Sequence, residues 1–118
     1  MSLILSLALL LNSSVVLPGG ENGADTELNC ITGPVDREYG GSAFAIYSCD
    51  DGKSVVAVAK RGSAAYPFYF IVSPVGGEVR LYGEGDGDGD ASRAAFADLN
   101  EFVPADVADL VEATKAHG

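Results

Sequence analysis

The stretch SAFAIYSCDDGKSVVAVA, residues 42–59, decides the fold, because it reads as two β-strands joined by a tight turn. Phe44 and Ile46 stand two positions apart, and a period of two is typical of a strand with one buried face. The segment DDGK, residues 50–53, carries a turn signal, with Gly52 at a left-handed position that only glycine adopts at little cost. The stretch therefore predicts a β-hairpin.

The segments after this hairpin extend it into a sheet. Residues 55–58 are apolar on both faces, which is typical of a strand in the middle of a sheet. FYFIVS, residues 68–73, continues as an aromatic and β-branched strand, and EVRLY, residues 78–82, alternates apolar and polar side chains. Strands joined by short connections usually pair with their neighbours in the chain. We therefore expect a four-stranded antiparallel meander.

From Ala91 onward the apolar residues follow a helical period. Asp90 is expected to cap the first helix, and Pro104 to begin the second, because proline is favoured in a first helical turn. Each helix has one apolar face that needs a surface to cover it. The sequence thus predicts a two-layer α+β domain with both C-terminal helices packed on one face of the sheet. The residues expected on the apolar faces are Ala95, Phe96, Leu99, Phe102 and Val103, and then Val107, Leu110, Val111 and Thr114.

The N-terminal part of the chain is expected to lie outside this domain. Residues 3–11 are apolar apart from one serine, which is the length of a secretory core and too short to span a bilayer. We therefore interpret residues 1–20 as a signal peptide, residues 21–41 as a linker and N-terminal loop, and residues 42–118 as the α+β domain. The alternative is that the apolar run forms the first strand or helix of the fold.

The two cysteines, Cys30 and Cys49, favour the same interpretation. They fit one disulfide, which would tie the N-terminal loop to the domain in an oxidising compartment. Structural zinc needs four ligands, and the single histidine, His117, lies next to the end of the chain. We expect a periplasmic or secreted protein without a membrane span in its mature form; the alternative is a cytosolic protein with two buried thiols.

The charge of the chain limits the kinds of partner that can be expected. Its 118 residues carry 17 acidic and 7 basic side chains, for a formal net charge of -10. Nucleic acid is excluded as an expected partner, because binding to phosphates needs a basic surface. A basic protein or a cation is favoured. Catalysis by a Ser-His-Asp or Cys-His arrangement is not expected either, because it needs an internal histidine.

An acidic ladder, EGDGDGD at residues 84–90, follows the last predicted strand. Its carboxylates have the spacing of the first half of a calcium loop, but in both registers alanine occupies the position of the closing carboxylate. Repulsion between carboxylates about 7 Å apart in water costs roughly 0.6 kcal/mol per pair, so metal is not required for them to coexist. The two interpretations are a calcium site and an acidic linker that begins a helix. The candidate ligands are Glu84, Asp86, Asp88 and Asp90.

Tyrosines offer a second candidate site. If Phe68 and Phe70 face the helices, Tyr69 lies on the other face of the sheet, with Tyr47 or Tyr82. Tyrosines on an exposed sheet face can form a recognition surface, although they can also simply cover the sheet. The expected function is thus that of a small exported, non-catalytic protein that binds a protein or a small ligand in a bacterial-type envelope.

One segment suggests a further alternative. YSCDDGKSVVAVA, residues 47–59, resembles the opening hairpin of the small secreted inhibitors of c-type lysozyme, in which a strand ending in cysteine turns through Asp and Gly into an apolar strand. The likeness covers about a tenth of the chain, and the Ser-Ala-Ser-Gly segment of those inhibitors has no counterpart here. The resemblance implies inhibition of a basic cell-wall hydrolase.

Overall fold

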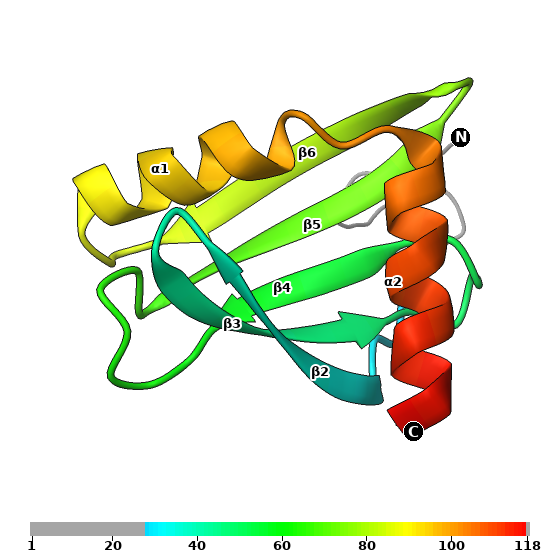
Figure 1. The fold of residues 1–118 in the computed structure, drawn as a ribbon, viewed down its shortest axis with the longest axis horizontal. Helices are drawn as coiled ribbons and strands as arrows, with labels where there is room; N and C mark the ends of the chain where they lie inside the picture. The colour runs from blue at the N-terminus through cyan, green and yellow to red at the C-terminus, as the bar shows by residue number, and fades with distance from the viewer. Residues whose placement is uncertain (1–27, 118) are drawn as a thin grey trace, which may run out of the picture.

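A computed structural model describes residues 28–117 as one sheet covered on one face by two helices (Figure 1). The sheet is an antiparallel meander in the order β2-β3-β4-β5-β6. The predicted two-layer α+β fold is confirmed, with five strands in place of four. The predicted signal peptide, residues 1–20, lies outside the described residues. The elements are β2 (Thr32–Tyr39), β3 (Ser42–Ser48), β4 (Val55–Ala59), β5 (Phe68–Val75), β6 (Glu78–Gly85), α1 (Gly89–Leu99) and α2 (Pro104–His117).

The additional strand, β2, occupies a segment that the sequence predicted as loop. Only Val35 and Tyr39 of this strand are buried, and they stand four positions apart with exposed residues between them. The period of two is therefore lost, and Gly33 and Pro34 add a loop-like composition. The pairing of β2 with β3 shifts register between Thr32 and Val35, which accommodates these two residues.

The hairpin of β3 and β4 forms as predicted. Ile46 pairs with Ala57, and Gly52 has a φ of 72°, in the left-handed region. The Asp51 carboxylate closes the turn by accepting hydrogen bonds from the backbone N–H groups of Lys53 and Ser54 and from the Ser54 hydroxyl. Partial burial raises the pKa of Asp51, but these hydrogen bonds lower it more, so the pKa lies below its usual value.

The core lies between the sheet and the helices. One face of the three middle strands is mostly apolar, with Ser42 and Ser48 of β3 as its buried polar residues. It packs against residues of both helices, which removes their apolar surface from water. Phe70 is buried and Phe68 packs partly buried against the same cluster, so both face the helical layer as predicted. The sheet residues of this core include Phe44, Ile46, Val55, Ala57, Phe70 and Val72, and the helical ones are Ala95, Leu99, Val107, Leu110 and Val111.

Helix α1 begins earlier than the sequence predicted. Its N-cap is Asp88, whose carboxylate accepts hydrogen bonds from the N–H groups of Asp90 at 2.8 Å and Ala91 at 3.2 Å. The prediction of Asp90 as N-cap was wrong by two residues, because alternating Asp and Gly offer several equivalent caps. Asp90 lies instead in the first turn and forms an ion pair with Arg93. Phe96 is 43 % exposed, so the apolar face of α1 is only partly covered.

Helix α2 begins at Pro104 as predicted and buries the expected face. Val107 and Thr114 are fully buried, with exposed fractions of 0 %. The Thr114 hydroxyl lies 2.6 Å from that of Ser48 and 2.7 Å from the Val111 carbonyl oxygen. A buried polar group is thereby satisfied at the contact between α2 and β3.

The predicted disulfide between Cys30 and Cys49 is present. It joins the segment before β2 to the end of β3, and the Asp50 N–H donates to the Asn29 carbonyl oxygen beside it at 2.9 Å. A disulfide is consistent with an oxidising extracytoplasmic compartment. Within residues 28–117, no helix is long and apolar enough to cross a bilayer.

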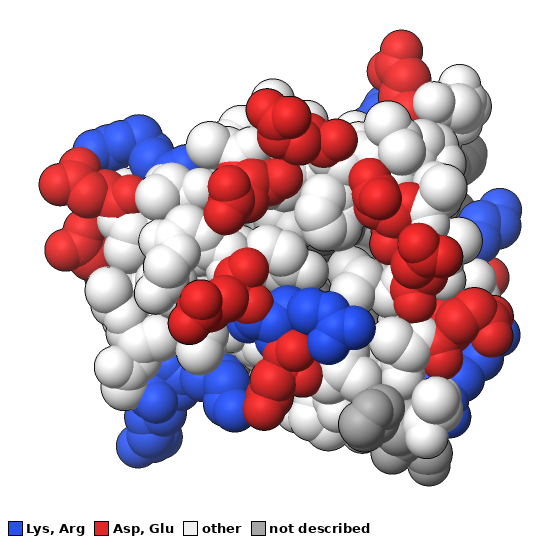
Figure 2. Space-filling view, viewed as in Figure 1, with Lys and Arg blue, Asp and Glu red and all other residues white. Residues whose placement is uncertain are grey.

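Acidic side chains concentrate in the helical layer. Eight of the 17 Asp and Glu residues follow Gly85, against two of the seven Lys and Arg residues. Between residues 28 and 85, six acidic side chains stand against five basic ones. Figure 2 shows acidic groups distributed over the helical side of the molecule. The sheet is thus nearly neutral, whereas the helical layer carries most of the negative charge.

Candidate binding face

The face of the sheet that points away from α1 and α2 has an apolar centre, and we call it the open face. Its members are the residues that alternate with the core positions, because neighbouring side chains of a strand point to opposite faces. They form continuous rows: Tyr47 pairs with Val56, Val56 with Ile71, and Ile71 with Tyr82. The apolar residues of the open face are Ala43, Ala45, Tyr47, Val56, Val58, Tyr69, Ile71 and Tyr82.

Charged side chains border the apolar centre on both edge strands. Asp36 of β2 forms an ion pair with Lys60 at 3.0 Å, and both side chains remain substantially exposed. Arg80 and Glu84 stand on β6, at the opposite edge. An apolar centre with a polar rim is the arrangement found at protein-protein interfaces.

All three predicted tyrosines lie on this face, and two of them converge. Tyr82 donates to Glu84 Oε1 at 2.7 Å, and Tyr69 donates to the same oxygen at 3.3 Å. The strand pairing explains the cluster, because Tyr69 is directly opposite Glu84. Tyr47 lies two strands away on β3 and takes no part in it.

Glu84 also affects the ionisation of these two phenols. The hydrogen bond to Glu84 and the negative charge of that carboxylate raise the pKa of Tyr82. Burial raises the pKa of Tyr69, and the charge of Glu84 and the hydrogen bond to it raise it further. Both phenols therefore stay protonated to a higher pH than a free tyrosine does.

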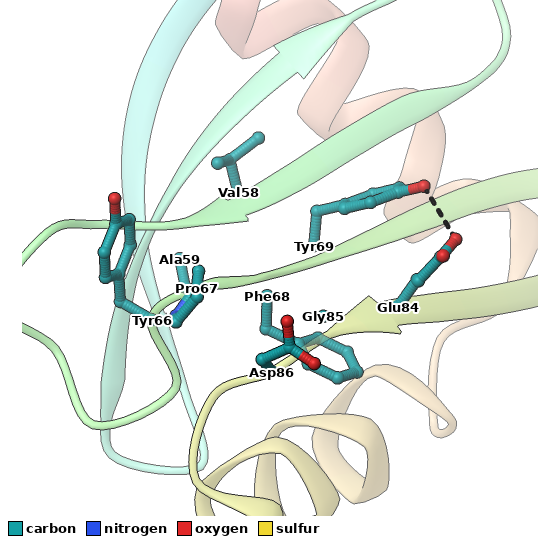
Figure 3. Close-up of a pocket in the computed structure, with 9 residues that line it drawn as sticks. All are labelled: Val58, Ala59, Tyr66, Pro67, Phe68, Tyr69, Glu84, Gly85 and Asp86. Atoms are coloured by element: carbon teal, nitrogen blue, oxygen red, sulfur yellow. Dashed lines mark hydrogen bonds between the residues drawn. The ribbon is translucent and has the colours of Figure 1, made fainter.

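A hollow of about 380 Å³ opens beside this cluster, where β4, β5 and β6 meet the loop before β5 (Figure 3). Tyr66 stands at one end, Tyr69 and Glu84 at the other, and Asp86 between them in this view. Tyr66 was not among the predicted site residues, because it lies in a loop where strand periodicity gives no information. The residues that line the hollow are Val58, Ala59, Tyr66, Pro67, Phe68, Tyr69, Glu84, Gly85 and Asp86.

Packing requires glycine at position 87 of the acidic ladder and at position 83, just before the ladder begins. A Cβ at Gly83 would lie 2.8 Å from Phe70 and 2.9 Å from Phe68, closer than carbon atoms approach each other. A Cβ at Gly87 would overlap the carbonyl oxygen of Ala65. The N–H groups of Asp86 and Gly87 both donate to the Pro67 carbonyl oxygen at 2.9 Å. The alternation of Gly with acidic residues therefore brings this segment close to β5 and its preceding loop.

The structure gives three of the four predicted calcium ligands other partners. Glu84 accepts from the two tyrosines, Asp88 caps α1, and Asp90 pairs with Arg93. Among residues 28–117, no three Asp, Glu, His or Cys side chains gather closely enough to hold a metal ion. Calcium binding at this ladder stays a prediction that no contact in the structure favours.

Comparison of the chain with protein families, with characterised proteins and with solved structures finds no match in any of the three. The function is therefore inferred from the chemistry of the open face and the hollow.

Proposed function

We propose that this is an exported, non-catalytic binding protein that holds a basic protein partner against the open face. The observation that carries the proposal is the apolar centre of that face, with Val58 at 38 % and Tyr82 at 54 % exposed and charged residues at both edges. A contiguous exposed apolar area with a polar rim is typical of an interaction site.

The charge of the chain supports a basic partner. A net charge of -10 attracts cationic proteins over a distance of about one Debye length, roughly 8 Å at physiological ionic strength. The carboxylates that a partner on the open face would meet are Asp36 and Glu84 on its edge strands and Asp86 beside the hollow, whereas those of the helical layer lie on the other side of the sheet. The nearly neutral open face would then supply the apolar contact. The disulfide supports a periplasmic or secreted location for this interaction.

Site-specific photo-crosslinking tests the proposal. The photoreactive residue p-benzoylphenylalanine is placed at Val58 on the open face, and as a control at Val103, which is 54 % exposed in the link between the helices. The variants are expressed in the native cell and irradiated. We expect one discrete cross-linked product from the first position and none from the second.

The identity of the product gives the decisive result. The cross-linked protein should be basic, and the yield should fall as salt screens the attraction between the two charges. Equal cross-linking from both positions, or an acidic partner whose yield does not respond to salt, would overturn the proposal.

The two alternative functions have tests of their own. For calcium, the amide signals of residues 85–92 are followed by NMR during addition of millimolar Ca²⁺, and unchanged signals would remove that prediction. For inhibition of a basic cell-wall hydrolase, bacterial lysis by c-type lysozyme is measured with excess protein, and unchanged lysis would remove it.

A further inference from the structure

We infer that the hollow between Tyr66 and Glu84 binds the cationic end of an arginine or lysine side chain on the basic protein partner. The inference rests on the proposed function and names the feature of the partner that this part of the open face recognises. Three properties of the hollow support it, namely an available carboxylate oxygen, exposed aromatic rings and a size that suits one side chain.

The carboxylates provide the charge. Both tyrosine hydroxyls donate to Oε1 of Glu84. The other carboxylate oxygen, Oε2, accepts no hydrogen bond from residues 28–117 and is available to a ligand. These two bonds, at 3.3 and 2.7 Å, restrain the Glu84 carboxylate, which reduces the entropy that binding would cost. Asp86 lies along the same wall and is exposed. A guanidinium or ammonium group can therefore meet one positioned carboxylate and a second nearby carboxylate.

The aromatic rings provide the second element. Tyr66 is 40 % exposed and lines the hollow together with Tyr69. A cation lying over the face of such a ring is attracted by the negative charge of its π-electrons. The ring of Tyr66 already makes one contact of this kind, because the guanidinium carbon of Arg61 lies 5.7 Å from its centroid. Arg61 does not line the hollow, so it does not occupy the space that an incoming cation would use.

The apolar parts of the wall fit the stem of a long side chain. Val58, Ala59 and Pro67 line the hollow between the tyrosines and the body of the sheet. Arginine and lysine carry aliphatic stems that pack on apolar surface while the charged end remains partly hydrated. A metal ion fits this environment poorly, because it needs several oxygen ligands and few apolar neighbours.

NMR titration of the intact, disulfide-bonded protein tests the inference. The probes are N-acetyl-arginine amide, N-acetyl-lysine amide and N-acetyl-citrulline amide, the last being a neutral analogue of the arginine probe. We expect the amide signals of Tyr66, Tyr69 and Asp86 to shift at millimolar concentrations of the two cationic probes. The citrulline probe should bind at least fivefold more weakly. Equal shifts with the neutral probe, or shifts spread over the acidic residues of α2, would overturn the inference.

Two variants locate the site. Glu84→Gln removes the charge but keeps an oxygen that accepts from the tyrosines, and it should weaken binding of the arginine probe at least fivefold. Asp109→Asn, at an exposed position of α2, removes the same charge from the opposite layer and should leave binding within twofold. Equal effects of the two variants would show that the attraction is general and would overturn the inference.

The probe titration and the cross-linking experiment can fail independently of each other. If cross-linking at Val58 succeeds while the arginine probe fails to bind, the open face is an interface and the hollow is not its cation site. If the probe binds at the hollow but no basic protein cross-links, the cation site is retained and the proposed function fails.

Discussion

At the scale of single residues, the acidic ladder shows how one pattern can serve two purposes. Asp88 caps α1 and Glu84 accepts hydrogen bonds from the two tyrosines, whereas Gly85 and Gly87 allow close approach to Phe68 and Ala65. The alternation begins in β6, where Glu84 and Gly85 point to opposite faces, and continues through the turn into the first residues of α1. Just before the ladder, Phe68 and Phe70 of β5 leave no room for a side chain at Gly83. This restriction cannot be recognised from the sequence before the pairing of β5 and β6 is known.

A glycine substitution tests this account. We expect Gly87→Ala to lower the free energy of unfolding by about 1–3 kcal/mol, because the new methyl group would overlap the Ala65 carbonyl oxygen. Gly89→Ala is the matched control, since its Cβ would meet nothing closer than 3.4 Å. Urea denaturation measures both variants. Equal stabilities would show that Gly87 serves flexibility and not packing.

The tyrosine cluster gives a prediction for pH dependence. Because the charge of Glu84 raises the pKa of both Tyr69 and Tyr82, Glu84→Gln should lower these pKa values toward 10.0. Phenolate absorbance should therefore appear at lower pH in the variant than in the unmodified protein. Glu78→Gln, on the same strand but outside the cluster, should leave the titration unchanged. Coincident titration curves for Glu84→Gln and the unmodified protein would contradict the assigned role of Glu84.

At the scale of elements, the sequence predicted the parts of the fold that have a regular period. The strands β3 to β6 and helix α2 follow from alternation, turn signals and the position of Pro104. Strand β2 could not be predicted, because its two buried residues are four positions apart. The site was predictable to the same extent: Tyr69 and Tyr82 follow from alternation, but their shared contact with Glu84 depends on the register of β5 and β6.

The contact between α2 and β3 gives a prediction at this scale. Thr114→Val keeps the shape of the side chain but leaves the buried Ser48 hydroxyl without its Thr114 partner. We expect the free energy of unfolding to fall by about 1–3 kcal/mol, the cost of an unsatisfied buried polar group. The double variant Thr114→Val with Ser48→Ala removes both hydroxyls and should recover part of this loss. Failure of the second substitution to recover any stability would show that the hydrogen bond itself is not the cause.

At the scale of the whole molecule, the two layers have different chemistry. The helical layer carries most of the excess negative charge, and the open face is apolar at its centre. Salt screens the field of the helical carboxylates within about 8 Å, so the charge that a basic partner meets at the open face comes from Glu84 and Asp86 beside the hollow. These two carboxylates would raise the rate at which a basic partner arrives, and the apolar centre of the open face would set how long it stays.

The disulfide is the covalent link on which this small domain depends. Cys30 and Cys49 are 19 positions apart, and closing a loop of this size restricts the unfolded chain enough to contribute roughly 3 kcal/mol. We expect Cys30→Ala with Cys49→Ala to lower the free energy of unfolding by about that amount in urea denaturation. Because β2 is an edge strand next to the bridge, its amide hydrogens should also exchange faster, whereas those of the central strand β4 should change less. The unmodified protein in reducing agent serves as control and should match the double variant. Identical urea midpoints with and without the reducing agent would contradict a stabilising bridge.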